Sequence, residues 1–246
     1  MILTIKNKKI FVNNFLSAIE KINNSCILSI NQKGFSSLLN SQDQTIILYS
    51  VFDHPNEIES LKLNLPDLNR LIKILNCIEA DEIELKIETN SIKYSSKDIR
   101  FTYHLLHDGI IPSCQLNPEK IKTIDYQTSF TITPETLVSI VRGSTLTSDN
   151  TAKIYFSTEN GEVFGELTDK QRDNVDSYKM KIAEAYKGEA IKEELPLTYE
   201  VLRNIASCRC PNGVNVLINH EKSVITFDVS AENVKSLYIA SGLRLI

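Results

Sequence analysis

Hydrophobic residues recur along this chain with two different periods, and the changes of period predict its elements. Between residues 130 and 167, Phe130 and Ile132 alternate with polar neighbours, which is typical of a half-buried β-strand. Leu137 and Ile140 then fall on one face of a short helix, and further alternating runs follow. We therefore predict a strand, a helix and two more strands in this stretch.

Capping and turn residues punctuate the same stretch. Thr133 can accept hydrogen bonds from free N–H groups at a helix start, and the Pro134-Glu135 pair suits the first turn. Gly143 is expected to end the helix. The segment Glu159-Asn160-Gly161-Glu162 lies between two alternating runs, and Asn-Gly in that setting indicates a β-hairpin.

The strand–helix–strand unit occurs four times. Helices are expected at about 11–22, 66–78 and 134–143, and a fourth from about 199 with Thr198 as its cap. Cleanly alternating runs follow each helix and favour antiparallel sheets with one solvated face. Residues 107–125 have no periodicity, so we expect two domains, 1–110 and 126–246, with a connector at 111–125.

Composition indicates a folded protein whose partners are not set by bulk charge. The chain is 42% hydrophobic and 24% charged, and its net charge of −4 argues against a generally adhesive nucleic-acid binder. No apolar run approaches the roughly 20 residues that span a bilayer, and no secretory signal is apparent at the start. We expect an intracellular, cytoplasmic protein, in the host cytoplasm if it is viral, with no membrane partner.

The motifs of common enzymes are missing from the sequence. It has no glycine-rich phosphate loop, no nucleophile elbow and no His-Glu-x-x-His motif. The five cysteines lack the spacing of a zinc site. Asp169, Asp173 and Asp176 lie close in sequence, but a polar loop explains them better than a divalent-cation site, which needs several converging oxygens. We expect no catalytic residues, no metal and no cofactor.

The four predicted helices are more basic than the rest of the chain. Acidic residues on them are fewer and lie mostly in first turns, where the helix dipole accounts for them: Glu20, Asp67, Glu135 and Glu200. Basic residues number six: Lys21, Arg70, Lys73, Arg142, Arg203 and Arg209. Short polar residues complete the expected exposed faces: Asn14, Ser17, Asn69, Asn76, Ser139, Asn204 and Ser207. Such a surface suits transient contact with a phosphate backbone, although ordinary solvated helix faces are the alternative.

In its organisation the chain resembles the DNA sliding clamps, most closely those of tailed phages, which are related to proliferating cell nuclear antigen. Paired strand–helix–strand units in two domains carry the resemblance, together with several local segments. These segments are 153–157 (KIYFS), 165–169 (GELTD), 174–177 (NVDS) and the end of the chain, 238–246 (YIASGLRLI). The resemblance covers essentially the whole chain.

The resemblance implies an α+β DNA-clamp fold of two similar domains, with antiparallel sheets outside and four helices inside. It implies a homotrimeric ring that encircles double-stranded DNA and tethers a replicative DNA polymerase, with a clamp loader as a further partner. The six basic helix residues would then contact DNA. The implied subunit contact joins strand 99–106 of one copy to 176–183 of the next, through Phe101, Tyr103, Leu105, Tyr178, Met180 and Ile182.

The resemblance also implies a pocket for partner peptides between the connector and the end of the chain. Apolar connector residues and a carboxyl-terminal segment would line it: Ile110, Ile111, Leu116, Ile121, Tyr238, Ile239, Ala240 and Ser241. The sequence departs from the family by lacking proline after Ala240. The competing function is a DNA-binding polymerase accessory subunit of the same fold that does not close into a ring. Such a protein needs strongly basic helices, and a surplus of two positive charges favours the ring.

Overall fold

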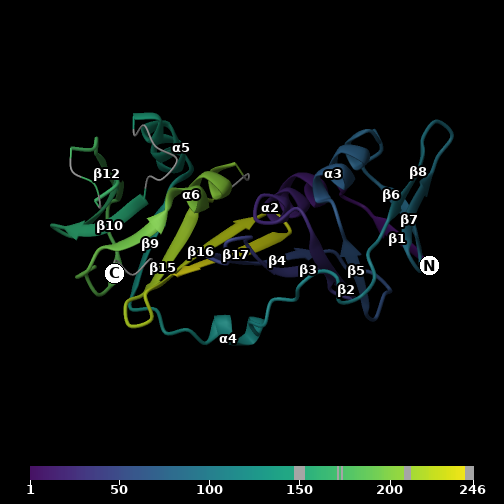
Figure 1. Cartoon of the computed structure of the whole chain (residues 1–246), viewed down its shortest axis with the longest axis horizontal. Helices are drawn as coiled ribbons and strands as arrows, with labels where there is room; N and C mark the ends of the chain where they lie inside the picture. The colour runs from purple at the N-terminus through teal and green to yellow at the C-terminus, as the bar shows by residue number, and fades with distance from the viewer. Residues whose placement is uncertain (147–152, 171, 173, 208–211, 242–246) are drawn as a thin grey trace. The chain divides into compact units, whose positions relative to one another are not determined.

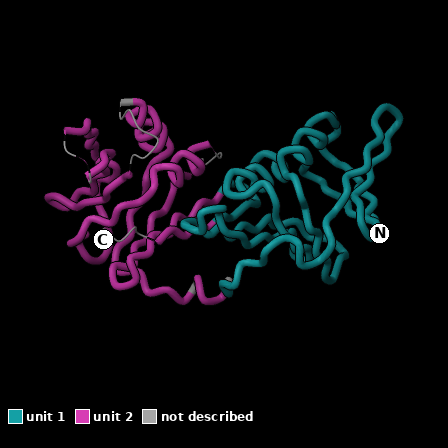
Figure 2. Tube along the Cα trace, in the orientation of Figure 1, with its two compact units in different colours: residues 1–118, 231–236 teal, residues 119–230, 237–246 magenta. Residues whose placement is uncertain are grey.

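The computed structural model describes residues 1–146, 153–170, 172, 174–207 and 212–241. The chain divides into two compact units, shown in different colours in Figure 2. Unit 1 contains residues 1–118 and 231–236, and unit 2 contains residues 119–230 and 237–246.

Unit 1 consists of two antiparallel four-stranded arrangements with helices beside them (Figure 1). Strand orders are β1-β6-β7-β8 in one and β4-β3-β2-β5 in the other. The elements are β1 (Ile2–Ile5), α1 (Lys8–Ile10), η1 (Phe11–Leu16), α2 (Ser17–Glu20), β2 (Cys26–Asn31), β3 (Gly34–Asn40), β4 (Ile46–Asp53), β5 (Leu61–Leu65), α3 (Leu68–Asn76), β6 (Ile83–Glu88), β7 (Ser91–Ser95) and β8 (Arg100–His104).

Unit 2 repeats this plan, after the short helix α4 (Pro118–Lys122). One sheet has the order β12-β11-β10-β14, and the other contains β13-β9-β15-β16 followed by β17. The elements are β9 (Thr128–Ile132), α5 (Pro134–Gly143), η2 (Ser144–Leu146), β10 (Lys153–Glu159), β11 (Glu162–Thr168), β12 (Tyr178–Ala183), β13 (Lys187–Gly188), β14 (Leu195–Thr198), α6 (Tyr199–Ala206), β15 (Val214–Asn219), β16 (Val224–Ala231) and β17 (Val234–Ser241).

Each unit has its own aromatic and aliphatic core. In unit 1 the rings of Phe11, Phe15, Phe35 and Phe52 lie within 5.0–6.0 Å of one another in the pairs that touch. In unit 2, Phe156 packs edge-on between two other buried phenylalanines, Phe130 and Phe227. The cores thus join helices to sheets, because these rings come from both kinds of element in unit 1 and from neighbouring strands in unit 2.

The first helix differs from its prediction in start and in pitch. It begins at Lys8, three residues before the expected start, and its middle is a π-helix over Phe11–Leu16. There the N–H of Ser17 bonds the carbonyl of Val12, five residues back. The wider turn changes the helical phase, so Asn14 is buried at 8% exposure and the prediction of an exposed Asn14 was wrong.

The two Thr caps predicted from the sequence differ in the structure. Thr133 accepts a hydrogen bond from the Thr136 N–H at 3.2 Å, which confirms it as the side-chain cap of α5. Thr198 occupies the N-cap position of α6, but its side chain makes no capping bond. Its extended backbone leads directly out of β14, and the prediction of a side-chain cap there was wrong.

The hairpin predicted at Asn160-Gly161 is confirmed. Both residues have positive φ, and Glu159 and Glu162 face each other across the turn. Strand β3 and helix α4 were not predicted, although β3 pairs with both β2 and β4. Among the described residues, no helix has the length and apolar character required to cross a bilayer.

Candidate nucleic-acid and subunit surfaces

Helix α3 presents the basic residues of unit 1. Arg70 and Lys73 are both exposed and lie about one turn apart. Lys21 follows α2 at its C-cap position and is half-buried, and α2 lies against α3. Lys9 is a further exposed base on this helical layer, which the sequence analysis missed because the first helix starts earlier than its hydrophobic pattern indicates.

A hydrogen-bond network holds the start of α3. The carboxylate of Asp67 accepts the Arg70 N–H at 3.0 Å and the side-chain amide of Asn24 at 3.1 Å. The Asn24 carbonyl oxygens accept N–H groups of Leu68 and Asn69. The Arg70 N–H is the main cause of a lowered pKa of Asp67, with further contributions from Asn24 and the charges of Arg70 and Lys73. The helix that carries Arg70 and Lys73 therefore has a well-bonded N-terminus.

The other end of α3 is capped by a buried lysine. Lys8 is only 3% exposed, and its ammonium donates to the carbonyls of Leu75, at 3.2 Å, and Ile78. Burial is the main cause of its lowered pKa, which the charge of Asp81 partly opposes. These bonds satisfy carbonyls that a helix C-terminus leaves without intrahelical partners.

Unit 2 places its basic residues on a pair of packed helices. Helices α5 and α6 lie against each other, and the Tyr199 hydroxyl donates to the Val141 carbonyl at 3.3 Å. Arg142 is exposed in the last turn of α5. Arg203 is exposed on α6 and forms an ion pair with Glu200 at 3.0 Å. Arg209 lies outside the described residues.

Both strands implied in subunit contact are terminal strands of their sheets. β8 ends the order β1-β6-β7-β8, and β12 ends the order β12-β11-β10-β14. On β8, Phe101 is half-buried and Tyr103 is buried at 4% exposure, with Leu105 half-buried just beyond. On β12, the alternating apolar residues run from half-buried to buried: Tyr178, Met180 and Ile182. Each strand has one edge without a partner within its own sheet, as strand addition requires.

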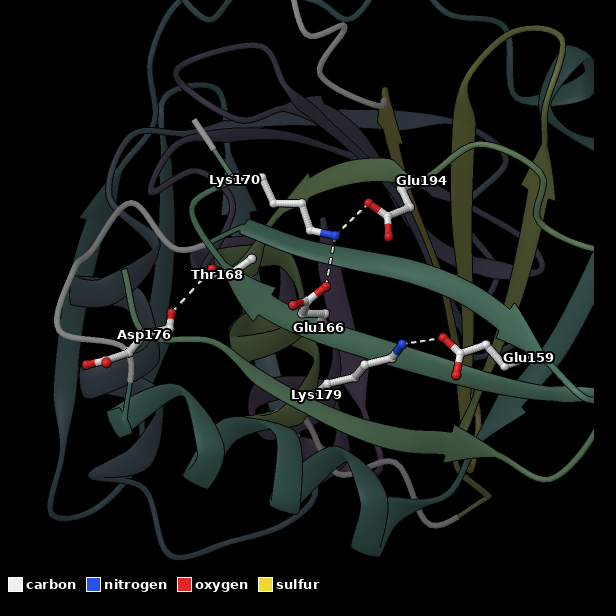
Figure 3. A network of polar contacts seen from close by, with 7 residues as sticks. All are labelled: Glu159, Glu166, Thr168, Lys170, Asp176, Lys179 and Glu194. Carbon is white, nitrogen blue, oxygen red and sulfur yellow. Dashed lines mark hydrogen bonds and ion pairs between the residues drawn. The ribbon is translucent and has the colours of Figure 1, made fainter. Parts of the chain in front are cut away.

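The solvent face of the β10–β12 sheet is covered by ion pairs (Figure 3). Lys170 joins Glu166 at 2.8 Å and Glu194 at 2.7 Å, and its ammonium lies 4.8 Å from the centre of the Tyr155 ring. Lys179 pairs with Glu159. Hydrogen bonds to the two carboxylates oppose the effect of burial and raise the pKa of Lys170.

The residues proposed for a partner-peptide pocket differ widely in exposure. Ile110 is 56% exposed, Leu116 is half-buried and Ile111 is buried, all in unit 1. Ile121 belongs to unit 2 and is also buried. On β17, the side chains of Tyr238, Ile239 and Ala240 are buried and that of Ser241 is exposed.

Two surface hollows lie elsewhere. One, of about 580 Å³, is on the β1–β8 sheet, with Ile2, Lys93 and Arg100 among its lining residues. The other, of about 520 Å³, lies between β9, the start of α5 and the end of β12. Within the part of the chain that the structure describes, no three His, Cys, Asp or Glu residues gather as metal ligands. Asp169 pairs with Arg172 at 3.2 Å, and Asp173 is outside the described residues.

Comparison with solved structures identifies the fold. Proliferating cellular nuclear antigen (PCNA) of Entamoeba histolytica matches with a TM-score of 0.77 at 12% identity, covering 98% of both chains. PCNA of A. fulgidus, solved with the C-terminal region of FEN-1, gives 0.76 at 12% identity with the same coverage. The PCNA2–PCNA3 complex of Sulfolobus tokodaii gives 0.73 at 12% identity, again covering 98% of both. No protein-family model and no curated protein matches the sequence. The chain therefore has the DNA-clamp fold, mixed α and β with antiparallel sheets.

Proposed function

We propose that this chain is the subunit of a DNA sliding clamp of the tailed-phage type. Three copies close head to tail into a ring around double-stranded DNA, and the ring tethers a replicative polymerase. The observation that carries the proposal is the clamp fold over 98% of the chain, in each of the PCNA structures compared. The two domains, 1–110 and 126–246, contribute similar halves of the subunit, joined by the connector at 111–125.

The exposed bases of the helices supply the DNA contacts. Arg70, Lys73, Arg142 and Arg203 are exposed on α3, α5 and α6, and Lys21 and Arg209 complete the set. Contacts of this kind neutralise phosphates and carry no sequence information, so the ring can slide. A small surplus of positive charge is sufficient, because a closed ring leaves duplex DNA only at its ends or by opening.

Partners bind the ring and bring no chemistry to it. The polymerase and an ATP-driven clamp loader dock by short peptides on a pocket formed by the connector and the end of β17, which includes Ile110, Ile111 and Ala240. FEN-1 is the partner named for the A. fulgidus PCNA. Tethering raises the effective concentration of the polymerase at the primer end, so dissociation is local and quickly reversed.

The decisive experiment measures mass and topological retention together. We expect sedimentation to give a mass three times that of the 27.8 kDa chain. Rings closed around nicked circular DNA, with a loader or by mild opening, should remain bound in high salt and escape once the circle is linearised. A strict monomer at every concentration, or equal loss from circular and linear DNA, contradicts the ring and favours the accessory subunit.

Charge reversal on α3 tests the DNA-facing surface. Arg70→Glu combined with Lys73→Glu should shorten retention at low salt, while the mass of the ring is unchanged. Lys33→Glu combined with Lys62→Glu makes the same change in charge at exposed positions of the β2–β3 turn and β5. If both pairs of substitutions have equal effects, α3 does not face the DNA.

A further inference from the structure

The solvent faces next to the two terminal strands carry opposite charge. Arg100 is the first residue of β8, is exposed, and lines the 580 Å³ hollow. Its guanidinium has no ion pair with any described residue. Lys86 and Lys93, farther into the same sheet, share the carboxylate of Glu88 at 3.1 and 2.5 Å. The edge of unit 1 therefore presents one uncompensated cation beside its terminal strand.

The corresponding edge of unit 2 presents a surplus of acid. Lys181 on β12 contacts two carboxylates, Glu162 at 3.1 Å and Glu184 at 2.7 Å. Hydrogen bonds to Glu184 and Glu162 raise the pKa of Lys181, so it stays charged, and the three groups together carry one net negative charge. The side chain of Glu184 is 80% exposed, which leaves its second oxygen open to another donor.

Strand direction decides whether these charges meet when one copy joins the next. All the strand pairs with a reported register within the two units are antiparallel. An antiparallel addition of β12 to β8 places the end of β12 beside the beginning of β8, and both apolar rows on the same face. Arg100 then lies next to the Lys181–Glu184 end of its partner strand.

We propose that Arg100 of one copy pairs with Glu184 of the next and selects the antiparallel register of the subunit contact. The inference rests on the proposed ring. Exposed ion pairs contribute little to stability, but charge complementarity governs association rate and rejects mismatched registers. An anionic cluster with one surplus charge facing one free guanidinium is the complementary arrangement.

A charge-swap series in the full-length protein tests the pair. At low salt, Arg100→Glu or Glu184→Lys alone should raise the dissociation constant of the assembly about tenfold, because like charges then face each other. The double variant should return it to within about threefold of the unmodified chain. Added salt should shrink all these differences, since the Debye length falls from about 10 Å at 0.1 M to about 3 Å at 1 M.

Matched controls and a competing rescue make the result decisive. Lys97→Glu, in the β7–β8 turn, and Glu221→Lys, in the β15–β16 turn, change the same charges at exposed positions. If these controls match the single variants, or if the double variant is no tighter than the singles, the pairing is wrong. Rescue of Arg100→Glu by Asp176→Lys instead overturns the antiparallel register, since Asp176 precedes β12. An unmodified chain that never assembles refutes the proposed ring itself.

Discussion

The hydroxyl of Tyr103 holds both backbone groups of Asp67. It donates to the Asp67 carbonyl at 2.8 Å and accepts the Asp67 N–H at 2.9 Å. Burial raises the pKa of Tyr103 to about 12, so the hydroxyl keeps its proton across the physiological range. One side chain therefore joins the terminal strand β8 to the start of the basic helix α3.

Removing this hydroxyl should destabilise unit 1. Tyr103→Phe leaves the buried backbone groups of Asp67 without their partner, and we expect a loss of about 1–3 kcal/mol in the free energy of unfolding. Urea unfolding measures it. Tyr94→Phe is the matched control, because the Tyr94 hydroxyl has no hydrogen-bond partner among the described residues; it should change stability by less than about 0.5 kcal/mol. Equal effects of the two would contradict the role of the Asp67 contact.

Lys8 should make stability rise with pH in the alkaline range. Its folded-state pKa lies below the ordinary 10.5, so between these two values the unfolded chain holds a proton that the folded chain has released. Raising the pH through this window therefore favours the folded state. The difference in unfolding free energy between the unmodified chain and Lys8→Met should grow in favour of the unmodified chain there. Lys9→Met, at the exposed neighbouring position, should give a difference without this slope.

The two N-cap threonines should differ in their contribution to stability. Thr133→Ala removes the bond to the Thr136 N–H and should cost about 1 kcal/mol. Thr198→Ala removes a side chain that makes no capping bond, so its cost should be a few tenths of a kcal/mol. Thermal unfolding of the two variants compares them directly. A larger cost at Thr198 would show that its hydroxyl has a role other than capping.

Gly143 should resist the substitution that usually strengthens a helix. Alanine is about 1 kcal/mol better than glycine in a helix interior, but a Cβ at Gly143 would lie 2.2 Å from the ring of Tyr178. Gly143→Ala should therefore destabilise the chain and displace Tyr178 from its place on β12. Adding the same change to Tyr178→Ala should cost nothing further. A double-mutant cycle measures the coupling, and additive effects would contradict the contact.

The periodicity of apolar residues predicted most of the elements of both units. The hairpin at Asn160-Gly161 and the cap at Thr133 were predictable because each depends on residues adjacent in sequence. Strand β3 was missed because its run from Gly34 to Asn40 contains serines and paired leucines without strict alternation. It is a strand because its two neighbours, β2 and β4, supply hydrogen bonds on both edges.

The sequence by itself determined the repeated strand–helix–strand plan and the basic character of the helices, because local spacing and residue type decide both. Only the tertiary structure decided which strands end their sheets, since pairing partners lie far apart along the chain. It also decided that Lys8 is buried and caps α3, and that a π turn hides Asn14. These properties depend on long-range packing, in which a polar group is buried only where distant carbonyls or amides can bond it.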